Sequence, residues 1–264
     1  MKAAAREGWA SFAQLEWVTT PAAAKLVAFA GIQAGQKVLD VGCGTGVVAV
    51  TAARLGATVS GLDLTPALLE RAKENAELAG VSIEFREGDV EALPYNDAAF
   101  DVVLSQFGHM FGPRPVVAVG EMLRVLRAGG RIAFSTWPPE LYTGRMFALM
   151  AAYLPPSPEG AAPPPQWGNP EIIRERLGDA VTDITFDRDI LYTPALSPEH
   201  LMQTFARSGG PLAKLVESLK SDPARLKEFR AAYHRVIEPY FRENRLHQSF
   251  LMTRATKRFD QPLK

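Results

Sequence analysis

The chain has 264 residues, 47% of them hydrophobic, with 29 basic residues balanced by 29 acidic ones. That length predicts one large domain, or one domain with a cap. The balanced charge argues against nucleic-acid binding, which usually requires a basic excess. The single cysteine, Cys43, excludes an internal disulfide and indicates a reducing compartment, so we expect a cytoplasmic protein. Arg6, Glu7 and Glu16 interrupt the N-terminal stretch, which therefore lacks the apolar core of a signal peptide, and no apolar run reaches the length of a membrane span.

Residues 1–35 are expected to form helices, which either fold back over a pocket or only pack against the sheet, and for their aromatic residues we expect simple packing. The stretch contains four large apolar residues, Trp9, Phe12, Leu15 and Trp17. Thr20 followed by Pro21 predicts the start of a second helix, because threonine caps helices and proline suits the first helical position.

Residues 36–137 alternate between strand and helix patterns. Short apolar runs predict strands, and longer segments that end in glycine predict the helices between them. Strands joined by helical crossovers form a parallel sheet with helices on both faces. The expected strands are 37–41, 58–63, 82–87, 100–106 and 131–137, and the expected helices are 46–56, 65–80 and 113–130.

The remaining residues depart from this alternation. Residues 138–170 hold nine prolines, so 138–180 is expected to be an insertion, either a lid over the carboxyl edge of the sheet or a surface connector. Residues 181–264 are expected to supply two helical stretches and the closing strands, 183–193 and 249–259. An apolar stripe over residues 226–241 predicts a helix packed on the core, which Pro239 should end.

Residues 38–46, VLDVGCGTG, end the first strand with three glycines at alternate positions. In an open parallel sheet, ligands bind beyond the carboxyl ends of the strands, and glycine lets them approach the backbone closely. Residues 44–49 fit the pattern G-x-G-x-x-[GA] of dinucleotide-binding proteins, which is weak by itself. Asp63 also ends the second strand, where NAD-binding proteins carry a ribose-binding acid. A nicotinamide-dependent oxidoreductase is therefore an alternative.

Asp40 favours a different ligand. It lies two residues before the first glycine, where its repulsion of a pyrophosphate would cost a few kcal/mol at an effective dielectric of about 20. The same carboxylate favours a ligand that carries an ammonium and a sulfonium, and S-adenosylmethionine joins both cations to an adenosine. After the third strand, Asp89 can accept a hydrogen bond from the adenine amine, and the N–H of Val90 can donate to a ring nitrogen. Asp40, Asp63 and Asp89 thus follow three successive strands.

At these residues the chain resembles the class I S-adenosylmethionine-dependent methyltransferases. Within that family it is similar to the branch of the ubiquinone and menaquinone biosynthesis methyltransferases. The resemblance covers residues 36–137 and rests on four segments: VLDVGCGTG, GLDLTPALLERAK, FREGDVEALPYNDAAFDVVLS and EMLRVLRAGGRIAFSTW. It implies an α/β, Rossmann-like three-layer sandwich with a helical cap. Its seven-stranded, mostly parallel sheet would have an antiparallel last strand, SFLMTRATK.

The resemblance also implies roles for individual residues. Asp40 would hold the methionine ammonium, and Asp63 would bind the ribose hydroxyls. Leu64 would pack on the adenine, whose edge Asp89 and Val90 would read. Ser105 and Gln106 would lie near the transferring methyl. The implied cofactor-binding set is Asp40, Gly42, Cys43, Gly44, Gly46, Asp63, Leu64, Asp89, Val90, Ser105 and Gln106.

Methyl transfer from a sulfonium is a direct displacement that depends on alignment, and a base is needed only if the acceptor must lose a proton. His109, just after the fourth strand, is the candidate catalytic base, since its ordinary pKa suits that task. The alternative is a histidine that only satisfies a backbone carbonyl. No metal site is expected, because no acids cluster in the segment that follows this strand.

The expected partner is a small, largely apolar acceptor, methylated on oxygen or carbon. Its candidate wall residues, most of which could equally belong to the core, are Phe107, Met110, Phe111, Trp137, Tyr142, Met146 and Phe147. A protein that binds S-adenosylmethionine without transferring its methyl group remains a further hypothesis.

Overall fold

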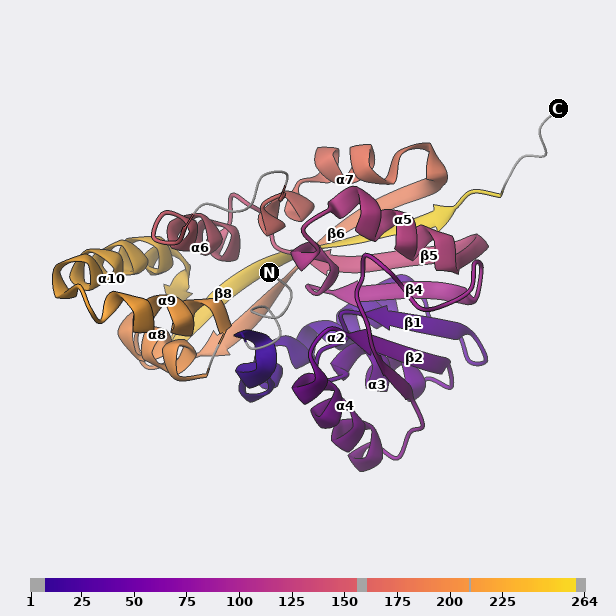
Figure 1. Cartoon of the computed structure of the whole chain (residues 1–264), viewed down its shortest axis with the longest axis horizontal. Helices are drawn as coiled ribbons and strands as arrows, with labels where there is room; N and C mark the ends of the chain where they lie inside the picture. The colour runs from indigo at the N-terminus through magenta and orange to yellow at the C-terminus, as the bar shows by residue number, and fades with distance from the viewer. Residues whose placement is uncertain (1–7, 156–160, 209, 260–264) are drawn as a thin grey trace.

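A single mixed sheet organises the chain (Figure 1). The structure, a computed structural model, describes residues 8–155, 161–208 and 210–259. The strand order is β3-β2-β1-β4-β5-β8-β6; the first five strands are parallel, and β8 is antiparallel to β5 and β6. The strands are β1 (Lys37–Val41), β2 (Thr58–Asp63), β3 (Glu84–Glu87), β4 (Phe100–Gln106), β5 (Leu126–Thr136), β6 (Val181–Pro194), β7 (Phe241–Arg242) and β8 (Arg245–Lys257). The predicted α/β class and the antiparallel last strand are confirmed, and the two-residue β7 is an addition.

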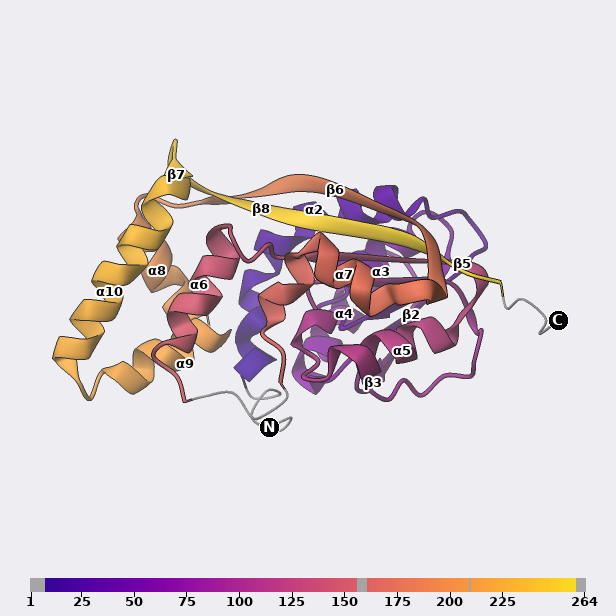
Figure 2. The same cartoon turned by 90° about the horizontal axis from the view of Figure 1, so that it is seen from above.

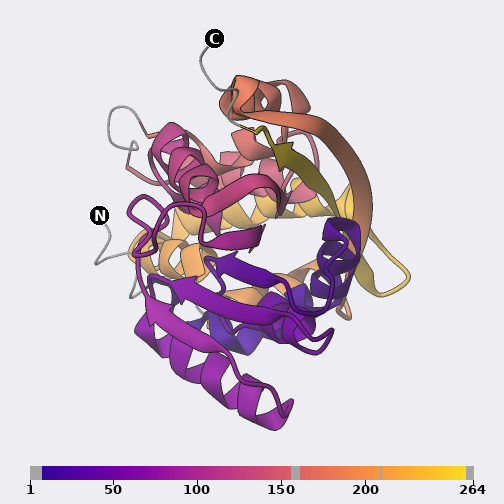
Figure 3. The same cartoon turned by 90° about the vertical axis from the view of Figure 1, so that its right-hand side faces the viewer.

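Helices cover both faces of the sheet (Figure 3). α2 (Glu16–Ala30) packs beside α3 (Val47–Ala53) on one face, and α5 (Pro115–Val125) packs beside α7 (Pro170–Leu177) on the other. α4 (Pro66–Leu78) contacts α3 and the short edge strand β3. Short 3-10 helices are η1 (Ala10–Leu15), η2 (His109–Phe111), η3 (Pro164–Gly168), η4 (Gly178–Ala180) and η5 (Glu238–Tyr240). None of the helices in the described ranges combines the length and apolar character that crossing a membrane would need.

Four further helices form a second core beyond the carboxyl ends of the parallel strands (Figures 1 and 2). They are α6 (Tyr142–Ala151), α8 (Pro198–Arg207), α9 (Gly210–Leu219) and α10 (Pro223–Ile237). Three of these helices, where the sequence predicted two, lie between β6 and β8. α10 ends two residues before Pro239, as predicted, and buries Phe229, Tyr233 and Ile237. We call these four helices the cap.

Three of the four cap helices, α8, α9 and α10, are carried on a ribbon made of β6 and β8. β5 ends its pairing with β8 where Thr136 meets Leu251, whereas β6 pairs with β8 as far as Arg245. Residues 245–250 of β8 therefore extend past the end of β5, together with the matching part of β6 (Figure 2).

Two predicted helix boundaries were wrong. α2 does not begin at Pro21 but runs through it from Glu16, whose carboxylate accepts hydrogen bonds from Arg71 (2.7 Å) and Asn75 (3.0 Å) of α4. This tertiary contact fixes the earlier start. α5 ends at Val125 rather than Gly130, because residues 126–130 enter β5 through a register shift opposite β4.

His109 is a core residue rather than a pocket residue. Its ring centroid lies 4.6 Å from those of both Phe134 and Trp167, and the residue is 1% exposed. Neither ring nitrogen has a hydrogen-bond partner among the described residues. Burial, with a smaller contribution from the nearby Arg176 charge, lowers the pKa of His109 to about 3. A buried, neutral histidine of this kind is a poor base, so the catalytic assignment of His109 is corrected.

The buried imidazole should make the folded state sensitive to acid. The unfolded chain binds a proton at this histidine below a pH of about 6.5, whereas the folded chain does so only below about 3, so stability is lost as the pH falls through this window. His109→Phe removes the titration. Urea unfolding near pH 7.5 and pH 4.5 should show that the free energy of unfolding of the variant, relative to that of the wild type, is about 3 kcal/mol higher at the lower pH than at the higher. An equal difference at both pH values would contradict this account.

Candidate functional site

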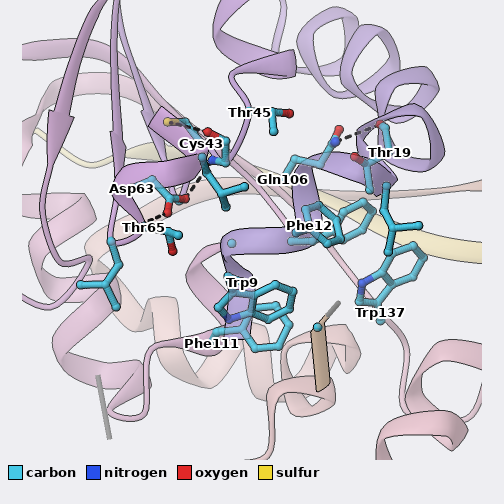
Figure 4. Close-up of a pocket in the computed structure, with 18 of the residues that line it drawn as sticks. Trp9, Phe12, Thr19, Cys43, Thr45, Asp63, Thr65, Gln106, Phe111 and Trp137 are labelled. Carbon is cyan, nitrogen blue, oxygen red and sulfur yellow. Dashed lines mark hydrogen bonds between the residues drawn. The ribbon is translucent and has the colours of Figure 1, made fainter. Parts of the chain in front are cut away.

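A cavity of about 410 Å³ lies beyond the carboxyl ends of β1, β2 and β4 (Figure 4). In the view of Figure 4, Cys43, Asp63 and Thr65 gather on one side, and Phe12 and Trp137 lie on the other. The cavity therefore has a polar half, which adjoins the glycine loop, and an aromatic half.

The glycine loop joins β1 to α3 through three left-handed residues. Gly42, Gly44 and Gly46 have φ angles of 63°, 54° and 79°, which side chains rarely adopt. A Cβ on Gly42 would lie 2.9 Å from the Cα of Gly108, so these two backbones meet directly. A Cβ on Gly44 would meet nothing within 4 Å, and Gly44 lines the cavity. The loop therefore presents bare backbone to a ligand at Gly44.

Asp40 lies under this loop and is 1% exposed. Its Oδ2 accepts a hydrogen bond from the N–H of Ala49 (3.0 Å), but Oδ1 is buried without a partner in the described part of the chain. Burial, and secondarily repulsion from Asp63, raises the pKa of Asp40 to about 8. A cation in the cavity would relieve both effects.

Asp63 ties the end of β2 to the loop. Its Oδ2 accepts from the N–H of Gly44 (2.8 Å), and its Oδ1 accepts from the N–H of Thr65 (2.8 Å), as Figure 4 shows. Burial raises the pKa of Asp63 although these hydrogen bonds oppose the shift. Both Asp63 and Leu64 line the cavity.

Asp89 and Val90 follow β3 and line the cavity beside Gly88. Asp89 Oδ1 accepts from the N–H of Glu91 (2.9 Å), which fixes the turn. Glu91, 6% exposed, accepts hydrogen bonds from the backbone N–H and the guanidinium of Arg114. The structure thus brings Asp40, Asp63 and Asp89 together along one side of the cavity.

Three other predicted cofactor residues differ in placement. Cys43 and Gln106 line the cavity, and Gln106 Nε2 donates to the carbonyl of Thr19 (3.0 Å). Ser105 does not line it: its hydroxyl donates to the carbonyl of Val41 (2.6 Å) and accepts from the N–H of His109 (3.0 Å). This role of Ser105 is structural, because one bond joins the ends of β4 and β1 and the other holds the turn that follows β4.

Gly46 also lies off the cavity. It forms the start of α3, and a Cβ there would lie 3.1 Å from Ala72 and Phe85. Its predicted direct contact with the cofactor is therefore corrected to a packing role.

Phe107 and Trp137 dominate the aromatic half. Their rings stack with centroids 4.0 Å apart and 9° between planes, and Phe250 meets Phe107 edge-on at 5.7 Å. Phe107 adopts a φ of 59°, a strained conformation that the bond from its N–H to Ser135 O helps to hold. Of the predicted wall residues, Met110 lies in the core and the others line the cavity.

The wall includes residues that the sequence did not reveal. Trp9 and Phe12, which were expected only to pack, line the cavity, and the ring centroids of Trp9 and Phe111 lie 4.7 Å apart. Further lining residues come from the cap and from β8: Thr143, Met150, Phe205, Leu212 and Gln248. Only the apolar helical periodicity could have indicated the cap residues, and that pattern does not distinguish a pocket wall from a core.

The cavity wall holds few ionisable groups. None of the described lining residues is Lys, Arg or His, and the carboxylates all lie in the polar half. Tyr142 is 4% exposed, and burial raises its pKa well above the ordinary value. Within the described ranges, no three His, Cys, Asp or Glu residues are grouped to hold a metal ion.

Sequence and structure comparison assign this site to a family. Residues 39–134 match the methyltransferase domain family. The Mycobacterium tuberculosis protein Rv1403c is 33% identical over 243 residues, which span 92% of this chain and 89% of that protein. A demethylmenaquinone methyltransferase of Thermus thermophilus is 38% identical over 109 residues, 40% of this chain and 50% of that enzyme.

Solved structures agree on the fold. A putative methyltransferase from Bacillus halodurans superposes with a TM-score of 0.61 at 20% identity, covering 90% of this chain and 99% of that one. With its glycine loop, its rim of three acids and its 3-2-1-4-5 parallel core, the chain belongs to the class I S-adenosylmethionine-dependent methyltransferases.

Proposed function

We propose that this enzyme transfers the methyl group of S-adenosylmethionine to an oxygen or carbon atom of a small, largely apolar acceptor. The division of the cavity carries the proposal: carboxylates and bare backbone line one half, and aromatic and aliphatic side chains line the other. The N-terminal segment and the cap together would enclose the acceptor.

The polar half fits the cofactor. The unpartnered Oδ1 of Asp40 is a buried acceptor that an ammonium group would satisfy. Asp63 has lone pairs left for the ribose hydroxyls after accepting two backbone N–H bonds. Leu64, Asp89 and Val90 would hold the adenine. When bound, S-adenosylmethionine supplies an electrophilic methyl group on a positively charged sulfur.

The chain's own contribution is alignment and exclusion of water. Gln106, at the end of β4, lies between the two halves and is held by its bond to Thr19. No histidine or lysine among the described residues faces the acceptor half. We therefore favour an acceptor whose nucleophilic atom needs no enzymic base, and any proton on that atom is lost to solvent after methyl transfer, when the product leaves the cavity.

The proposal is tested by binding and turnover together. S-adenosylhomocysteine should raise the melting temperature, and NAD⁺ or NADP⁺ should leave it unchanged. A labelled methyl-transfer screen over phenols, quinols and carboxylates should then yield product. Cofactor binding without transfer to any acceptor class would favour a binding protein, and a shift caused only by NAD⁺ would overturn the cofactor assignment.

Gly44→Ala tests the bare backbone of the loop. Gly80→Ala is the matched control, because Gly80 has a φ of 65° and an equally open Cβ position but lies outside the cavity. Both variants should lose about 1 kcal/mol of stability through left-handed strain. Calorimetry should show S-adenosylhomocysteine binding weakened at least about tenfold in Gly44→Ala alone, because the methyl group enters the cavity. Equal affinities in the two variants would place the ligand elsewhere.

Asp40 should make cofactor binding dependent on pH. Its carboxyl, with a pKa near 8, must give up a proton to pair with the ammonium, so affinity should rise from about pH 6 to pH 8, by at most about tenfold per unit. Calorimetry in buffers of different ionisation enthalpy should detect the released proton. Asp40→Asn should bind more weakly at pH 8 and show no such release. Proton release that persists in the variant would contradict the assignment.

A further inference from the structure

One polar side chain interrupts the apolar wall of the acceptor half. Alternate residues of β8 share a face, and on this face Leu246 and Phe250 are fully buried. Gln248 lies between them, is 5% exposed and lines the cavity. An amide placed where a strand otherwise buries apolar groups needs hydrogen-bond partners.

The described residues satisfy that amide only in part. Gln248 Nε2 donates to Thr193 Oγ1 on β6 at 2.6 Å, and Thr143 Oγ1 approaches Gln248 Oε1 at a long 3.5 Å. A carboxamide has two N–H donors and two carbonyl lone pairs. One N–H and at least one lone pair therefore remain for a ligand.

Gln248 lies in the part of the cavity remote from the glycine loop. It is three residues past Leu251, which pairs with the end of β5, and so roughly 10 Å beyond that strand end. Phe250, next on the same face, meets the stacked Phe107–Trp137 pair. The amide and this flat aromatic surface thus adjoin the same space.

We propose that Gln248 selects the acceptor, a neutral planar aromatic molecule whose hydroxyl or carbonyl oxygen bonds to the carboxamide while its rings lie along the Phe107–Trp137 wall. The inference rests on the proposed function of the same cavity. Neutrality follows because no described lining residue carries a positive charge, and an anion would lose its hydration there without a counter-charge. A site built to bond an oxygen also discriminates against analogues that lack it.

The test uses the full chain saturated with S-adenosylhomocysteine and three probes: 2-naphthol, 2-naphthoate and naphthalene. Binding is measured by ligand-detected NMR and calorimetry. The variants are Gln248→Met, which keeps the length of the side chain but removes the amide, and Gln248→Glu. Thr193→Val is the matched control, since it removes the bond to β6 and leaves the amide in place.

The wild type should bind 2-naphthol best of the three. Gln248→Met should weaken the binding of 2-naphthol by about five- to tenfold, the range of one hydrogen bond, and leave the affinity for naphthalene unchanged. Gln248→Glu should keep its affinity for 2-naphthol and bind 2-naphthoate more weakly than the wild type does. Thr193→Val should keep the preference for 2-naphthol over naphthalene. S-adenosylhomocysteine affinity should stay constant in all three variants.

Two results would overturn the inference. The first is 2-naphthol binding that does not depend on Gln248 or does not exceed naphthalene binding in the wild type. The second is an equal loss of 2-naphthol affinity in Thr193→Val and Gln248→Met, which would mean that the amide only links β8 to β6. Either result with intact S-adenosylhomocysteine binding leaves the proposed function standing, whereas a wild type that fails to bind S-adenosylhomocysteine overturns the proposed function itself.

Discussion

The direct contact of two glycine backbones, Gly42 after β1 and Gly108 after β4, determines the shape of the site. The strand order reverses between these strands, and their carboxyl ends can separate only as far as the loops allow. A Cβ on Gly108 would lie 2.5 Å from the carbonyl oxygen of Gly42, so a side chain on either residue would push the loops apart. The hydroxyl of Ser105 donates a hydrogen bond to the carbonyl of Val41 and so links the same two strand ends. From this junction the loop turns toward Asp63, and the cavity opens above it.

The sheet could be predicted from the sequence because its signals are local. Most of the parallel strands are short apolar runs next to a helix pattern, whereas β3 is largely polar, and the strand ends place Asp40, Asp63 and Asp89 on one edge. Left-handed geometry at Gly42 and Gly44 was foreseeable for the same reason, since only glycine adopts it cheaply. The antiparallel strand β8 came instead from the family resemblance, because nothing in residues 245–257 states their partner.

The remaining features depend on contacts between distant segments. His109 and Ser105 are each next in sequence to a lining residue, yet they face the core, since the direction of a side chain after a strand end depends on the turn that follows. The start of α2 was set by Arg71 and Asn75, residues more than fifty positions away. Gln248 looks like an ordinary strand residue until Thr193 and the cap helices are placed around it.

The ribbon of β6 and β8 has a consequence for how such an enzyme diversifies. One half of the ribbon completes the sheet that carries the glycine loop, and the other half carries helices that line the apolar part of the cavity. Changes in residues 195–244 alter one end of the reaction chamber while leaving the glycine loop and its acid rim in place. Exchange of this segment between relatives would reshape the apolar part of the cavity and leave its polar part unaltered.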